Sequence, residues 1–272
     1  MRTFGAKYLN TMVENYFKTP SFYNNESYFE KYLGCTSYYL SLQNVVTKLV
    51  NLINPHFVLE LGSALGTTTL MLANLFRNIS FVGADIRGDV VVKANQGASV
   101  FENVSFIEAD MCELVTLDNL SDYDLIFLLY SFHHILDPLE NKIVFLRNCY
   151  NHMKLGSYLL IAETFIPEES RSLRHDQSIE DLFRIRSEEG YASTFWAALE
   201  SISTDGIDLA KAAGHFSRTE ESKAGDLVNS RVDEYLVKSS WLIKQAREIG
   251  FRVVLAEPVN VICEKAILLR KE

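Results

Sequence analysis

The sequence predicts an α/β fold built on a doubly wound, mainly parallel sheet of seven strands. Short apolar runs alternate with helical patterns between residues 57 and 163, and that alternation is typical of parallel strands joined by crossover helices. Several runs are almost continuously apolar, as expected for strands covered by helices on both faces. The last two strands, at 251–256 and 261–270, are separated only by a turn at 257–260. Because so short a link joins antiparallel neighbours, we expect an antiparallel last strand.

Composition limits the classes of function. The chain has 272 residues, a formal net charge of −9, and 48% hydrophobic and 22% charged residues. A large nucleic-acid footprint is not expected, since it needs clustered Lys and Arg. The four cysteines form no CxxC pair and no His, Asp and Glu cluster has metal-ligand spacing, so we expect neither a disulfide framework nor a metal site. With no long apolar run and no apolar leader, we expect a cytoplasmic protein without a membrane span.

Four segments follow from the pattern: a helical cap segment at 1–54, a core at 55–166, a helical insertion at 167–232 and the rest of the core at 233–272. The aromatic-rich start either caps a binding site or packs on the core. Its last part is a helix from Ser37 to about Ile53. The insertion begins just beyond the end of a strand, so we expect a lid or substrate cap; a helical elaboration without substrate contact is the alternative.

The core elements are expected in a regular order. Strands are predicted at 57–61, 80–84, 104–108, 124–129 and 158–162, and helices near 67–76, 89–100 and 140–153. The inner face of the last helix should carry Ile143, Leu146, Cys149 and Tyr150. A helix at 234–249, ended by Gly250, then leads into the two final strands.

The turn after the first strand is the centre of the predicted site. Glycines let a backbone approach a ligand closely, and the N-terminus of the following helix offers free N–H groups. Glu60, Asp85 and Asp110 stand at or just after the ends of the first three strands, which meet at one edge of a parallel sheet. Three carboxylates there suit a nucleoside with a ribose diol, an exocyclic amine and a cationic tail. They would repel a phosphate-rich ligand, and the turn lacks the Lys of a phosphate-binding loop.

These residues carry a family resemblance. Residues 58–163, with the tail 241–270, resemble the small-molecule type of class I S-adenosylmethionine-dependent methyltransferase and its Rossmann-like sheet. The turn ELGSALG is similar to the family's E/D-x-G-x-G-x-G, with Ala64 in place of the middle glycine, and LYSFHHI at 129–135 resembles the motif after strand four. The resemblance implies S-adenosyl-L-methionine as cofactor and S-adenosyl-L-homocysteine as product. It also implies that the cofactor is held by Glu60, Gly62, Ser63, Gly66, Asp85, Ile86, Asp110, Met111 and the backbone of Leu129.

The catalytic candidates are His134 and His133, which follow strand four and should face the crevice. Methyl transfer is an in-line displacement, and a hydroxyl or carbon acceptor also needs a base, for which histidine has a suitable pKa. Structural packing is the alternative for either histidine. Glu163 is expected to orient a substrate or to cap a helix. Weaker candidates in the insertion are His175, Tyr191 and His215.

The expected function is methyl transfer to O, N or C of a small organic acceptor, such as one of natural-product or secondary metabolism, and that acceptor is the expected partner. Nucleic acid and membrane are not expected partners, and a homodimer stays open. One alternative is a tRNA- or protein-modifying methyltransferase that uses the insertion's arginines, Arg171, Arg174, Arg184 and Arg186. Another is a fold member that binds the cofactor without methyl transfer. A dinucleotide dehydrogenase is disfavoured, since the spacing G-x-G-x-x-G is absent.

Overall fold

The computed structural model describes residues 37–116, 120–135, 139–166, 168, 236–259 and 264–272. Apart from its first residues, this part of the chain belongs to one compact unit made of Ser41–Glu168 and Tyr235–Glu272. The cap predicted for residues 1–36 lies outside the described residues, and so does the insertion at 167–232 except for Glu168.

The described strands form a seven-stranded sheet in the order β3-β2-β1-β4-β5-β7-β6. The first five strands pair in parallel, and β7 runs antiparallel to both β5 and β6, which confirms the predicted fold class. The strand order changes direction between β1 and β4, where ligands bind in open α/β sheets. The bounds are β1 Phe57–Leu61, β2 Ser80–Asp85, β3 Val104–Glu108, β4 Leu125–Leu129, β5 Tyr158–Thr164, β6 Phe251–Pro258 and β7 Glu264–Lys271.

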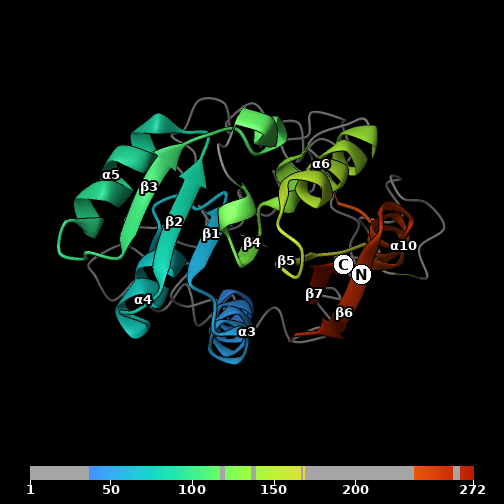
Figure 1. Cartoon of the computed structure of the whole chain (residues 1–272), viewed down its shortest axis with the longest axis horizontal. Helices are drawn as coiled ribbons and strands as arrows, with labels where there is room; N and C mark the ends of the chain where they lie inside the picture. The colour runs from blue at the N-terminus through green and yellow to red at the C-terminus, as the bar shows by residue number, and fades with distance from the viewer. Residues whose placement is uncertain (1–36, 117–119, 136–138, 167, 169–235, 260–263) are drawn as a thin grey trace, which may run out of the picture. The chain divides into compact units, whose positions relative to one another are not determined.

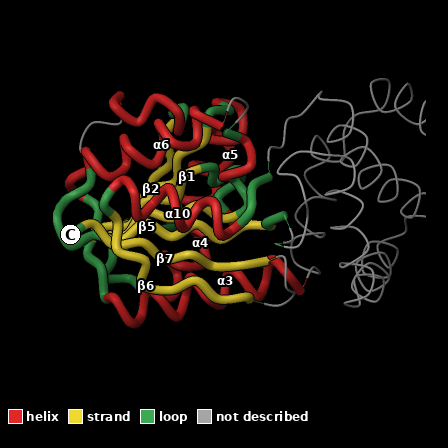
Figure 2. The backbone as a smooth tube through the Cα atoms, turned by 90° about the vertical axis from the view of Figure 1, so that its right-hand side faces the viewer, coloured by secondary structure: helices red, strands yellow, loops and turns green. Residues whose placement is uncertain are grey.

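Helices cover the sheet on both sides. Helix α6 lies on one side of the strands and α3 on the other (Figures 1 and 2). Phe145 of α6 and Leu242 of α10 belong to the same cluster of buried side chains as Leu128 of β4. No helix among the described residues is long and apolar enough to cross a membrane. The helices are α3 Ser37–Ile53, α4 Thr67–Leu75, α5 Gly88–Ala98, α6 Leu139–His152 and α10 Ser239–Ile249, with short 3₁₀ turns η2 Met111–Thr116, η3 Leu120–Asp122 and η4 Phe132–His134.

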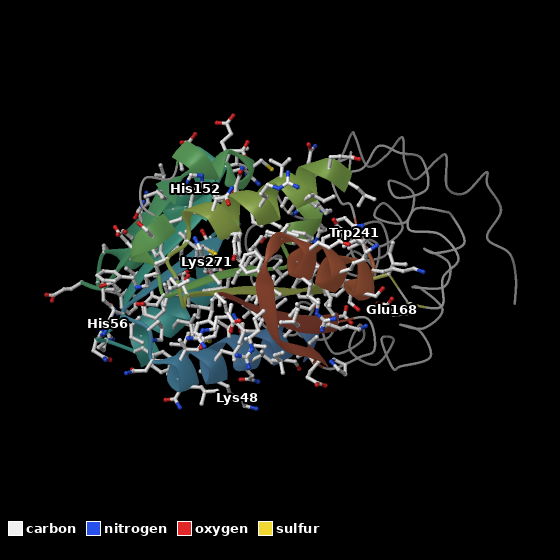
Figure 3. All side chains as sticks on the ribbon, turned by 45° about the vertical axis from the view of Figure 1, so that its right-hand side comes forward. Lys48, His56, His152, Glu168, Trp241 and Lys271 are labelled. Atoms are coloured by element: carbon white, nitrogen blue, oxygen red, sulfur yellow. The ribbon has the colours of Figure 1, made fainter. Side chains whose placement is uncertain are left out.

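Helix α10 begins later than predicted. The prediction placed its start at 234, whereas the helix starts at Ser239. The preceding residues are held extended, because the Ile166 N–H donates to the Val237 carbonyl at 3.0 Å. Glu168 then caps the helix: its carboxylate accepts from the Ser240 N–H at 2.9 Å and from the Ser239 hydroxyl at 2.6 Å. Figure 3 places Glu168 at this end of α10.

Two further details correct the prediction. Strand β6 continues through Glu257 and Pro258, which the prediction assigned to a turn. Pro258 is tolerated because β6 is an edge strand that pairs only with β7. On α6, Lys142 is fully buried, while Ile143, predicted for the inner face, is only half-buried; Tyr150 is half-buried and packs against the core as predicted. Hydrophobic periodicity misses this lysine because its burial depends on hydrogen-bond partners elsewhere in the chain.

Candidate cofactor-binding and catalytic site

The turn between β1 and α4 has a left-handed backbone at three positions. Gly62 and Gly66 have φ values of 77° and 76°, and Ala64 has a φ of 46°. The turn is fastened to β2, because the N–H groups of Gly62 and Ser63 both donate to the Ala84 carbonyl, at 2.8 and 3.0 Å. At Ala64 a side chain occupies a conformation that costs roughly 1–2 kcal/mol for a residue other than glycine. The alanine that replaces the family's middle glycine thus keeps a glycine-like backbone.

Internal packing also requires the two glycines. A Cβ added to Gly62 would lie 2.4 Å from the Cβ of Ser131, and one added to Gly66 would lie 2.3 Å from the ring of Phe106. Both distances are far below van der Waals contact. The prediction assigned these glycines to the approach of a ligand; the structure shows that they also let β3 and the segment after β4 pack against the turn.

Glu60 is a residue of β1, just before the turn. Its side chain is buried, and its carboxyl oxygen Oε2 accepts a hydrogen bond from the Thr69 hydroxyl of α4. Burial raises the pKa of Glu60 to about 8, against an ordinary 4.5. Glu60 therefore connects β1 to α4, and its contact with the ligand's amine stays a prediction.

Asp85, at the end of β2, combines a bond to the turn with remaining acceptor capacity. Its Oδ2 accepts from the Ala64 N–H at 2.8 Å and its Oδ1 from the Arg87 N–H at 3.0 Å. An ionised carboxylate has about four lone-pair sites, so about two remain for ligand hydroxyls. The neighbouring Ile86 is 62% exposed, an apolar surface available to a flat ring.

The ends of β3 and β4 meet the same turn. The carboxylate of Asp110 accepts from the Cys112 N–H at 2.7 Å. The methyl carbon of Met111 would lie 3.6 Å from a Cβ on Gly62. Leu129 ends the fully buried strand β4, and two residues later the Ser131 hydroxyl donates to the Leu61 carbonyl at 2.6 Å. The structure thus brings the predicted residues of four strand ends to one edge of the sheet.

One buried polar atom of this edge supports a ligand there. Ser63 is 6% exposed, and its Oγ has no hydrogen-bond partner among the described residues. Buried hydroxyls normally have a partner. Together with the acceptor capacity of Asp85 and the exposed Ile86, this atom fits a nucleoside ligand with hydroxyls and an apolar base.

The two histidines have different surroundings. His133 is 8% exposed, and its Nδ1 lies 2.9 Å from Oε2 of the buried Glu163, at the end of β5. His134 is exposed and lies against His133, with 4.2 Å between ring centroids. Glu163 is 2% exposed, and its carboxylate accepts from the ring and the backbone N–H of His133 in η4 and from the backbone N–H of Thr164 at 2.8 Å. The sequence offered both histidines as candidates; the structure pairs His133 with the buried carboxylate of Glu163.

Several residues of this site were not singled out from the sequence. Phe106 and Ser131 reach the turn region from distant parts of the chain, and Thr69 bonds to Glu60 from α4. Lys142 is a charged residue buried on a helix. The one available signal was Ser131, which lies inside the motif after strand four. The lid candidates His175, Tyr191 and His215 lie outside the described residues.

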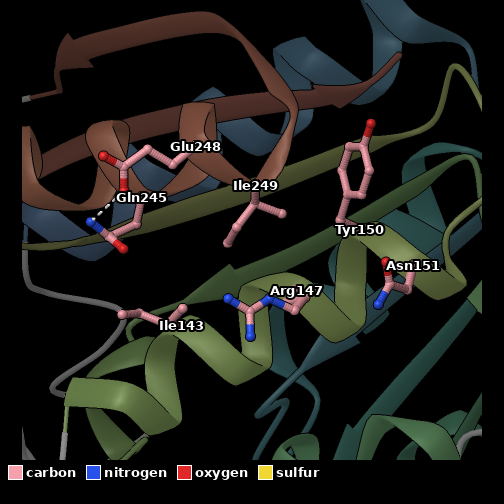
Figure 4. Close-up of a pocket in the computed structure, with 7 residues that line it drawn as sticks. All are labelled: Ile143, Arg147, Tyr150, Asn151, Gln245, Glu248 and Ile249. Atoms are coloured by element: carbon pink, nitrogen blue, oxygen red, sulfur yellow. Dashed lines mark hydrogen bonds between the residues drawn. The ribbon is translucent and has the colours of Figure 1, made fainter.

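Two other features do not belong to this edge. A cavity of about 320 Å³ lies between α6 and α10, next to Arg147, Tyr150 and Glu248 (Figure 4), and no predicted site residue lines it. Among the described residues, no group of three or more His, Cys, Asp and Glu side chains could hold a metal ion.

Comparisons with known proteins agree with this geometry. Residues 59–159 match a family model described as a methyltransferase domain. No curated protein matches the chain by sequence.

Among solved structures, human N-acetylserotonin methyltransferase in complex with S-adenosylmethionine is 18% identical, with 97% of this chain and 66% of that chain covered and a TM-score of 0.57. A putative O-methyltransferase from Nostoc punctiforme is 17% identical, with 84% of this chain and 55% of that chain covered and a TM-score of 0.53. A mitomycin 7-O-methyltransferase is 14% identical, with 80% of this chain and 50% of that chain covered and a TM-score of 0.52. The chain thus spans less than two thirds of the length of these structures.

At identities this low, the similarity to these solved structures shows only that the fold is shared. The match to the family model indicates the kind of domain. The strand order and the turn that ends β1 agree with both. Residues 59–159 are therefore similar to a methyltransferase domain and lie on a Rossmann-like sheet, and a domain of this kind implies S-adenosylmethionine as its cofactor.

Proposed function

We propose that the protein transfers a methyl group from S-adenosylmethionine to a hydroxyl of a small organic acceptor, with His133 as the general base. The pairing of His133 with Glu163 beside the cofactor turn carries this proposal. The O-methyltransferases among the similar folds support an oxygen acceptor. N- and C-methylation, and a tRNA or protein acceptor, remain the alternatives.

The cofactor residues have separate tasks in this proposal. Asp85 accepts hydrogen bonds from the ribose hydroxyls, and Ile86 packs on the adenine, whose edge meets Asp110 and the backbone N–H of Met111. The turn at 62–66, with Ser63, and the backbone of Leu129 hold the methionine end. Glu60 acts from beneath by bracing the turn. When bound, S-adenosylmethionine supplies a methyl group on a positively charged sulfur.

The base follows from the tautomer of His133. Because Nδ1 faces the Glu163 carboxylate at 2.9 Å, it carries the proton in the neutral ring, and the lone pair is on Nε2. Nε2 then accepts the hydroxyl proton of the acceptor while the oxygen attacks, and Glu163 stabilises the imidazolium that forms. General-base catalysis of this kind contributes about 10²–10⁴-fold to the rate.

Acceptor recognition belongs, in this proposal, to the segments 1–54 and 167–232, and the protein is expected in the cytoplasm. Both segments lie largely outside the described residues, which is why the acceptor is assigned only to a chemical class.

The test measures S-adenosylhomocysteine formation with a panel of phenols, aliphatic alcohols and amines. We expect turnover with a hydroxyl compound, a loss of about 10²-fold or more in His133→Ala, and a change below about fivefold in the neighbouring His134→Ala. Turnover with amines alone, or a His133→Ala variant as active as the wild type, would refute the proposed base.

A further inference from the structure

The buried amino group of Lys142 is a feature that the proposed mechanism does not use. The lysine is 0% exposed, and it lies on α6 behind the turn that carries both histidines. Its Nζ donates to the Phe132 carbonyl at 2.7 Å and to the Ile135 carbonyl at 2.6 Å. It also lies 4.5 Å from the centroid of the Phe132 ring. A lysine is almost never buried this far unless its ammonium group is paired.

The two acceptor carbonyls flank the histidines. Phe132 precedes His133, and Ile135 follows His134, so one ammonium group is bonded to both ends of η4. Both residues are buried, with exposures of 1% and 0%. The Phe132 carbonyl also accepts from the Ile135 N–H at 3.2 Å, and the Ile135 carbonyl accepts from Lys142. A side chain from another element thus bonds both to the first residue of η4 and to the residue that follows it, and a buried carbonyl without a donor is strongly unfavourable.

The same turn is fixed at two other places. The Ser131 hydroxyl donates to the Leu61 carbonyl at the cofactor turn, and Glu163 accepts from both the N–H and the ring of His133, at 3.3 and 2.9 Å. Burial is the main influence on Lys142 and lowers its pKa to about 7, while the Glu163 carboxylate and Cys112 oppose that shift. The lysine and the histidine–carboxylate pair thus belong to one buried group of charges.

We infer that Lys142 is a positioning residue for the methyl-transfer reaction, which holds η4 from behind so that the His133 ring meets Glu163 and presents Nε2 to the acceptor. It touches neither cofactor nor acceptor in this role. The expected effect of Lys142 on turnover rests on the proposed function of His133 as the base. The arrangement of His133 against Glu163 can be tested without turnover.

The first test observes the imidazole directly. A histidine N–H that donates to a carboxylate gives a far-downfield proton NMR signal, which is recorded on the full chain without cofactor or acceptor. His133→Asn and Glu163→Gln assign the signal by its loss. In Lys142→Met we expect the signal to broaden beyond detection, because η4 no longer holds the ring against Glu163. A Lys142→Met protein that is folded and keeps the signal at wild-type intensity would overturn the inference.

Leu146→Ala is the matched control. Leu146 lies one turn further along α6 and is 0% exposed, but its apolar side chain can make no hydrogen bond to η4. We expect it to lower the melting temperature and to keep the signal. Loss of the signal in this control as well would mean that any damage to α6 suffices, and would overturn a specific role of Lys142.

A measurement on the wild type covers the case in which Lys142→Met does not fold. With ¹⁵N-labelled lysine, the Lys142 ammonium should exchange slowly and show couplings across its hydrogen bonds to the carbonyl carbons of Phe132 and Ile135. A rapidly exchanging ammonium without these couplings would refute the bonds on which the inference stands.

Kinetics then separate the two proposals. In Lys142→Met we expect kcat to fall at least tenfold, with KM for S-adenosylmethionine and the Kd of S-adenosylhomocysteine within about threefold of wild type. An equal loss in kcat and in cofactor affinity would contradict a role limited to the base. If the NMR signal behaves as expected but His133→Ala keeps full turnover, the positioning stands and the proposed base fails.

Discussion

Glu60 shows at the scale of one residue that a motif acid can also have a structural partner within the fold. Its place in the turn motif led to the expectation of a contact with the cofactor's amine. The structure buries it under the turn with Thr69 as partner. A carboxyl that remains protonated near neutrality is a neutral hydrogen-bonding group, and this makes its burial tolerable.

The raised pKa of Glu60 predicts a pH-dependent stability. The folded-state value of about 8 lies above the ordinary 4.5, so between these pH values the folded protein keeps a proton that the unfolded chain releases. The contribution of Glu60 is therefore complete below pH 4.5 and is lost as the pH rises to about 8.

Glu60→Gln, which is neutral at every pH, removes this loss. Relative to the variant, the wild type should lose on the order of a few kcal/mol of unfolding free energy between pH 5 and pH 8, measured by urea unfolding. Glu102→Gln, at an exposed position, should follow the wild type. A constant difference between wild type and Glu60→Gln across this range would contradict the buried, protonated carboxyl.

At the scale of elements, the β1–α4 turn is a packed junction as much as a ligand site. Phe106 of β3 packs against the Cα of Gly66, and Ser131 after β4 packs against that of Gly62. A change in the turn therefore affects the neighbouring strand ends as well as the ligand.

Gly66→Ala tests this junction. The substitution combines a left-handed backbone with a Cβ 2.3 Å from the Phe106 ring, so we expect a loss of about 2–5 kcal/mol in unfolding free energy. Gly97→Ala in α5 is the matched control, since its Cβ would meet only a flexible Leu70 methyl at 3.3 Å, and it should be neutral or stabilising by up to about 1 kcal/mol. Equal stability of the two variants would disprove the packing role of Gly66.

For the molecule as a whole, local pattern was enough for most of the fold. Buried parallel strands are continuous apolar runs, and the short link before β7 determines that strand's direction, so both could be predicted. The late start of α10 could not, because Ile166 and Glu168, some 70 residues earlier in the chain, hold its first residues.

The candidate site divides in the same way. Asp85, Asp110 and the turn were predictable because strand ends of a parallel sheet meet at one edge. The bond from Thr69 to Glu60, the pairing of His133 with Glu163 and the bonds of Lys142 to the carbonyls of Phe132 and Ile135 could not be predicted, because hydrophobic periodicity does not show which polar side chains meet.

The central claim is that this edge holds S-adenosylmethionine with Asp85 on the ribose. Calorimetric titration of the full chain with S-adenosylhomocysteine tests it most directly. We expect one site in the wild type and a loss of about 1–3 kcal/mol of binding free energy in Asp85→Ala, since ligand hydroxyls lose a charged acceptor. In Asp89→Ala, a nearby exposed acid at the start of α5, binding should stay within about twofold of wild type. No binding to the wild type, or the same affinity in Asp85→Ala and Asp89→Ala, would contradict the account.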